Sequence, residues 1–112
     1  MPGVIERVPL LDRVIQPNDS LSFDVDVSGA RYVNVSVGVS EDVELQCTLY
    51  FGWSTINGVL YRPLQTDTVG PSSVLLTSVP VHGPLLRVDI ENQGSREQIV
   101  DFATIYAIRE AP

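Results

Sequence analysis

The sequence predicts an all-β protein, an antiparallel two-sheet sandwich of the jelly-roll type. Several segments alternate polar and apolar residues with a period of two, which is the period of a strand. Turns rich in glycine, proline and asparagine separate these segments. No segment carries a sustained apolar pattern at helical spacing. Together these three observations favour two packed sheets over any helical or mixed fold.

The first half of the chain holds three clear strands. Residues 20–27 alternate regularly and end at a glycine turn. Residues 32–40, YVNVSVGVS, place four valines on the inner face. Residues 43–53 form the third strand, in which Cys47 shares the parity of the leucines and is therefore expected to be buried.

The second half of the chain is interrupted more often. Asn57 and Gly58 form a strong hairpin signal. The return strand at 60–62 is expected to be short because Pro63 follows it, and 65–69 is expected to add an edge piece. The remaining strands are expected at 73–79, 85–91 and 99–109. Eight strands suit a jelly roll and seven an immunoglobulin-like sandwich, whose Cys, Trp and Cys hallmark is missing here.

Residues 1–18 are expected to lie outside the sandwich as an extended N-terminal arm, with the sandwich domain spanning 19–110. Prolines at positions 2, 9 and 17 break any long helix, yet the segment is too apolar for a free tail. An arm that lies on another surface satisfies both facts. The predicted interface residues are Ile5, Val8, Leu10, Leu11, Val14 and Ile15, together with Ile105 on the last strand.

Two strands have more uncharged or apolar surface than a lone sandwich can cover. The polar side of residues 32–40 carries only small uncharged residues, whereas a sheet face left to water usually carries charges. The last strand is apolar on both parities, with Ile105 on one and Tyr106 on the other. A two-layer sandwich covers only one of these faces, so the sequence predicts a protein that works in an assembly.

Composition argues against several function classes. The net charge is −7, lysine is absent, and the seven arginines are scattered, so nucleic-acid binding is not expected. No apolar run approaches the roughly 20 residues of a membrane-spanning helix. The N-terminal sequence lacks the unbroken apolar stretch of a signal peptide, so we expect synthesis in the cytoplasm with no cleavage.

No catalytic residue, cofactor or metal site is predicted. The one histidine, His82, lies in a bend without a nucleophile motif, and one histidine with one cysteine cannot form a structural zinc site. Asp24, Asp26 and the acidic residues at 41–44 do not form a calcium-binding loop. Asp89 and Glu91 share one strand face, where an ion-pair ladder is a simpler interpretation than glycoside hydrolysis. The protein is therefore not expected to be an enzyme.

Aromatic residues near one hairpin give an alternative function. Tyr50, Trp53 and Tyr61 fall close together in the predicted hairpin. Aromatic rings of this kind stack on sugars, so a carbohydrate-binding β-sandwich module is the alternative to a structural protein. The competing interpretation places Trp53 at the end of the core.

Two segments, residues 26–33 (DVSGARYV) and 79–88 (VPVHGPLLRV), resemble small jelly-roll modules. Such modules occur in bacteriophage virions, as head decoration or tail-associated proteins, and in discoidin-like carbohydrate-binding domains. The resemblance covers about residues 19–110 as a pattern of strands and turns. It implies a homo-oligomeric virion protein, with a trimer favoured, that cements or decorates a capsid. The implied partners are further copies of the chain and a capsid or other virion protein.

Overall fold

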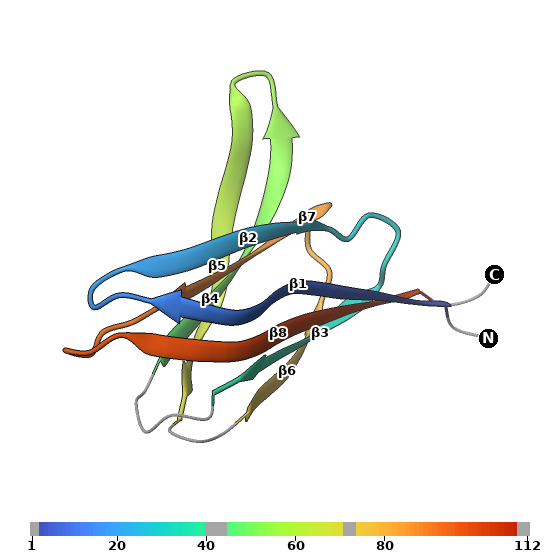
Figure 1. Ribbon diagram of the computed structural model, residues 1–112. Coiled ribbons are helices and arrows are strands. Elements are labelled where there is room, and N and C mark those ends of the chain that lie inside the picture. The colour runs from blue at the N-terminus through green and yellow to red at the C-terminus, as the bar shows by residue number, and fades with distance from the viewer. Residues whose placement is uncertain (1–2, 40–44, 71–73, 110–112) are drawn as a thin grey trace.

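The computed structural model describes residues 3–39, 45–70 and 74–109, which form eight strands in two antiparallel sheets (Figure 1). Sheet A contains, in spatial order, β1 (Gly3–Ile15), β8 (Gln98–Arg109), β3 (Tyr32–Gly38) and β6 (Val74–Pro80). Sheet B contains β2 (Ser20–Asp26), β7 (Leu85–Glu91), β4 (Leu45–Thr55) and β5 (Gly58–Val69). This interleaved order of two four-stranded sheets is that of a jelly roll, so the predicted fold class is confirmed.

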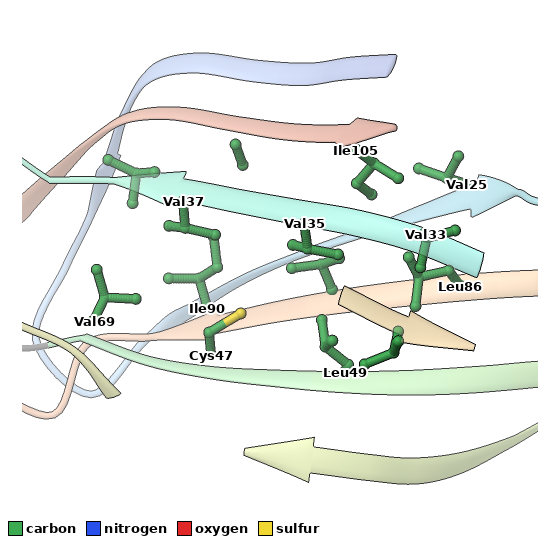
Figure 2. Close-up of a cluster of buried hydrophobic side chains, with 14 of the residues drawn as sticks. Val25, Val33, Val35, Val37, Cys47, Leu49, Val69, Leu86, Ile90 and Ile105 are labelled. Carbon is green, nitrogen blue, oxygen red and sulfur yellow. The ribbon is translucent and has the colours of Figure 1, made fainter. Parts of the chain in front are cut away.

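The core lies between the inner faces of the two sheets (Figure 2). Alternate residues of β3 are buried, and the valines predicted to point inward from it are the ones that do. Leucine and isoleucine side chains of β4 and β7 face them from sheet B. Cys47 lies in this core, as its parity predicted. Within the described segments, no helix is long and apolar enough to cross a membrane.

The segment expected as a separate arm is the first strand of the sandwich. Residues 3–15 pair antiparallel with β8, from Gly3 opposite Arg109 to Ile15 opposite Gln98. The pairing shifts register between Arg7 and Leu10, which places Pro9 at an irregularity of an edge strand. A proline is tolerated there because it lacks the N–H that a regular ladder needs. The prolines that excluded a helix are thus compatible with an edge strand, and this corrects the expectation of an arm outside the fold.

The return strand of the hairpin is also longer than expected. β5 continues through Pro63 to Val69 as one strand, where a short strand and a separate edge piece were predicted. The pairing with β4 shifts register between Leu49 and Tyr50, beside the proline. Since β5 is the edge of sheet B, the missing N–H of Pro63 interrupts little.

The β4–β5 hairpin projects beyond the rest of the sandwich (Figure 1). Its turn lies where the Asn-Gly signal placed it, between Thr55 and Gly58. The Thr55 hydroxyl donates to the Gly58 carbonyl oxygen at 2.6 Å and accepts from the Asn57 N–H at 3.2 Å. Gly58 has φ of +114°, a backbone conformation that other residues rarely adopt. These three residues fix the shape of the hairpin tip.

Candidate interaction surface

The outer face of sheet B carries the charges expected of a sheet in contact with water. Arg87 forms a double ion pair with Asp24, with Nε to Oδ1 at 2.8 Å and an Nη2 to Oδ2 hydrogen bond at 3.2 Å. The Tyr61 hydroxyl donates to Asp24 Oδ2 at 2.8 Å, and the guanidinium carbon of Arg87 lies 3.8 Å from the centre of the Tyr61 ring. The hydrogen bond from Arg87 lowers the pKa of Asp24, and the bond to Asp24 raises the pKa of Tyr61. The charges of Arg87 and Asp24 are thus paired within the chain.

The outer face of sheet A is different where β3 pairs with β6 and β8, because the outward positions of these paired segments carry no charged side chain. The pairing of β3 with β6 and β8 sets its residues in rows across the sheet. We call this surface the uncharged face, and it consists of Tyr32, Asn34, Ser36 and Gly38 on β3, Val74, Leu76, Ser78 and Pro80 on β6, and Phe102, Thr104, Tyr106 and Ile108 on β8. In an acidic chain, such a surface is suited to contact with another molecule.

Small residues give the uncharged face a hollow. A Cβ atom on Gly38 would clash with the Phe102 ring, so this ring lies across the bare backbone of β3. Further along β3, the short Asn34 and Ser36 form the floor of a hollow of about 380 Å³. Leu76 and Tyr106, from the strands on either side, also line it, and Leu76 is 73% exposed.

The predicted interface residues do not all reach the surface. Leu11 is 60% exposed beside Phe102, at the margin of the uncharged face, and Val14 is also exposed. Ile15 and Ile105 are 2% and 0% exposed, because both point into the core between the sheets, and they are therefore unavailable to a partner. Three other predicted interface residues lie on β1, where their side chains are outside the described part of the structure: Ile5, Val8 and Leu10.

The sequence of β8 does not show which of its two sets of alternate residues faces outward. Both parities of this strand are apolar, and the alternation of burial breaks between Val100 and Ala103, which are both buried. Ile105 therefore follows Ala103 inward, and Tyr106 faces out into the hollow. Leu76 could not be recognised from the sequence for a related reason: β6 is apolar on both parities, and only its pairing with β3 brings Leu76 opposite Ser36.

The three aromatic residues of the alternative function do not share one face. Tyr61 pairs with Gly52 on the outer side of sheet B, and Tyr50 has the same parity as Gly52. Trp53 has the opposite parity and packs against the core and Gly83. It lines a small hollow of about 190 Å³ together with Arg62 and His82. A single stacking platform made of all three rings is not formed.

The reactive side chains are not arranged for catalysis in the part of the chain that the structure describes. The His82 ring packs edge-on against Phe51, with ring centres 5.6 Å apart. Burial raises the pKa of Cys47 to about 12, which keeps its thiol protonated at neutral pH. No group of three metal-binding side chains was found among the described residues. Of the acidic residues considered for calcium, Asp24 and Asp26 are described, whereas Glu41, Asp42 and Glu44 lie outside the described residues.

No protein-family model matches the chain, and no curated protein matches it. Solved structures are nevertheless similar. The Yersinia pseudotuberculosis-derived mitogen has a TM-score of 0.60 at 10% identity, with 100% of this chain and 90% of the mitogen covered. The Bacillus endospore appendage structure, described as disulfide-linked pili, has a TM-score of 0.63 at 13% identity, with 98% and 92% covered.

The exported protein XepA of PBSX has a TM-score of 0.68 at 12% identity. The alignment covers 96% of this chain but 38% of XepA, so the chain corresponds to only part of that protein. This chain shares their β-sandwich fold. At identities this low, the similarity shows the fold alone and transfers no activity.

Proposed function

We propose that this protein is a non-enzymatic structural protein that assembles as a homo-oligomer on a larger particle, a bacteriophage virion, where it decorates or cements the capsid. The observation that carries the proposal is the uncharged face of sheet A. A sandwich that worked alone in water would be expected to carry charges on both outer faces, as sheet B does.

The free energy of association follows from the residues of this face. On this face Leu76 is largely exposed and Val74 is half exposed, and Leu11 at its margin is also largely exposed. Full burial of a wholly exposed side chain of this kind stabilises by about 1.5–3 kcal/mol, so each contributes in proportion to its exposed fraction. Because each copy has a net charge of −7, two copies repel each other in most relative orientations. An uncharged face allows them to meet without burying unpaired carboxylates.

The assignment to a virion draws on the jelly-roll resemblance of the strand and turn pattern and on the jelly-roll order of the strands. The fold is also shared with pilus-forming endospore appendages and with part of XepA. We expect a trimer, and we expect a capsid or other virion protein as the second partner.

The oligomeric state tests the proposal. Size-exclusion chromatography with light scattering should show an oligomer for the wild-type protein and a monomer for Leu76→Asp, because a carboxylate on the uncharged face would be buried without a partner. The matched control is Thr68→Asp, which adds the same charge at an exposed position of sheet B. A wild-type protein that stays monomeric at high concentration and does not bind capsids of the phage encoding it contradicts the proposal.

A carbohydrate-binding module is the second candidate, favoured by one observation. Trp53 lines a hollow beside Arg62 and His82, and such a mixed aromatic and polar hollow could take one sugar ring. Trp53 is the only tryptophan, so a fluorescence titration with glycans reports on this hollow directly. A saturable shift would support the sugar-binding function, and an unchanged spectrum across a glycan panel would remove it.

A further inference from the structure

We propose that the tip of the β4–β5 hairpin of one copy enters the hollow of the uncharged face on the next copy. This inference rests on the proposed function, because it describes how the homo-oligomer is built. The contact is head-to-tail, because the tip of one copy meets the hollow of the next copy.

The hairpin tip carries apolar side chains that the geometry of its turn does not require. Ile56 is 98% exposed, the highest exposure among the large apolar residues described. The turn is held by Thr55, Asn57 and Gly58, so its geometry does not require isoleucine at position 56. Val59 and Leu60 beside it are also exposed. A single exposed apolar residue is common, but a cluster at the end of a projecting element indicates a contact site.

The tip and the hollow match in charge. Residues 54–60, STINGVL, contain no charged residue. The hollow is lined by uncharged side chains, with Leu76 and Tyr106 on its two sides. The rest of the chain carries fourteen acidic residues against seven basic ones. Tip and hollow are therefore two surfaces that two acidic copies can bring together without burying a carboxylate.

The two surfaces also match in shape. The hairpin projects beyond both sheets (Figure 1), and the hollow of about 380 Å³ can hold the Ile56 side chain with part of its neighbours. Two uncharged faces packed with hollow against hollow would leave a space between them. The unfilled space would lose the contacts that a close-packed interface needs. A projecting apolar tip fills the hollow.

This contact uses different surfaces on the two copies. A pair keeps an unused hollow on one copy and an unused tip on the other, so further copies can add until a ring closes. A trimer is one such ring, and an open filament forms if the rotation between copies does not close. In contrast, a symmetric dimer formed through the uncharged face alone would stop at two copies.

Two single variants separate the two halves of the contact. Ile56→Asp alters the tip and leaves the hollow intact, and Leu76→Asp alters the hollow and leaves the tip intact. Both residues are highly exposed, so thermal unfolding should match that of the wild-type protein. We expect each variant to weaken self-association at least about tenfold. Thr68→Asp, with the same added charge, should assemble like the wild type.

Mixing the two variants gives the decisive measurement. The intact tip of Leu76→Asp can enter the intact hollow of Ile56→Asp, so the equimolar mixture should form a pair with one copy of each, detected by light scattering or native mass spectrometry. If Ile56→Asp assembles like the wild type while Leu76→Asp is monomeric, the tip is not involved and this inference is overturned, although the proposed assembly stands. If the wild-type protein itself does not associate, the proposed function fails as well.

Discussion

Gly38, Ser36 and Asn34 shape the uncharged face by being small. Gly38 leaves room for the Phe102 ring to lie across β3, and a Cβ there would have to displace that ring. Ser36 and Asn34 leave the hollow beside it unfilled. A larger residue at either position would close the hollow without disturbing the core, since these side chains point away from it. The shape of the uncharged face is thus set by its small residues as well as by large ones such as Phe102.

Cys47 provides a direct test of the core. Burial raises its pKa from 9.0 to about 12, so its thiolate fraction at neutral pH is about a thousandfold lower than that of an exposed cysteine. We expect a thiol reagent to label the native protein very slowly and the urea-unfolded protein rapidly. Equal labelling rates in the two conditions would contradict the buried position of this side chain.

Asp24 should make stability depend on pH in the acid range. Its pKa is lowered in the folded state, chiefly by the hydrogen bond from Arg87, so the ionised form stabilises the fold. This stabilisation is present at neutral pH and is lost as the pH falls through the folded pKa of Asp24. The pair is substantially exposed, so the contribution is about 1 kcal/mol or less.

Urea unfolding of Asp24→Asn at neutral and acid pH measures this effect. We expect the variant to be less stable than the wild type at neutral pH, with the difference in free energy of unfolding shrinking in acid. In an Arg87→Ala background, the substitution should matter much less, because the hydrogen bond that lowers the pKa is gone. A difference that grows in acid would contradict the sign of the shift.

At the scale of elements, β1 shows how an edge strand can look like a loose segment. Its one proline, Pro9, disfavours a helix and interrupts a regular ladder, and its sequence lacks the clean alternation of β2 or β7. The edge of a sheet tolerates such irregularity because only one side of the strand is paired. Ile15 then anchors the end of the strand in the core.

Deleting residues 1–16 distinguishes a strand from a dispensable arm. The deletion would open the edge of β8 and remove Ile15 from the core, so we expect loss of the cooperative thermal transition followed by far-UV circular dichroism. Leu11→Ser, at an exposed position of the same strand, should unfold close to the wild type. A shortened chain with wild-type stability would show that the pairing with β8 is not needed for folding.

The strands with strict alternation were predictable within a few residues. β2, β3 and β7 occupy the expected positions because each buries one face and the period of two is visible in the sequence. The candidate site was only partly predictable. The unusual outer side of β3 was visible, but Leu76 and Tyr106 come from strands far away along the chain, and their place beside it depends on pairing.

At the scale of the whole molecule, charge is distributed unequally over the two outer faces. The net charge of −7 opposes contact between copies, and in the proposed assembly the uncharged face and the hairpin tip are the surfaces where they meet. Attraction that comes from apolar burial and repulsion that comes from net charge respond differently to salt. The balance between them is therefore open to measurement.

Salt should strengthen the association. When the ionic strength rises from about 0.01 M to about 0.15 M, the Debye length falls from about 30 Å to about 8 Å, which screens the repulsion between acidic copies. An apolar contact is affected little over this range, so we expect the dissociation constant from sedimentation velocity to fall. Weaker association at higher salt would instead indicate that ion pairs hold the copies together.

The sequence by itself determined the all-β class, the regular strands and the small outer residues of β3, because each depends on a local period or on residue size. Only the tertiary structure decided that residues 3–15 are an edge strand, that Ile105 faces inward and Tyr106 outward, and that Leu76 stands across the hollow from Tyr106. These outcomes depend on which strands pair and on which face the second sheet covers. Both are set by contacts between segments distant in the chain, for which a single sequence carries no local signal.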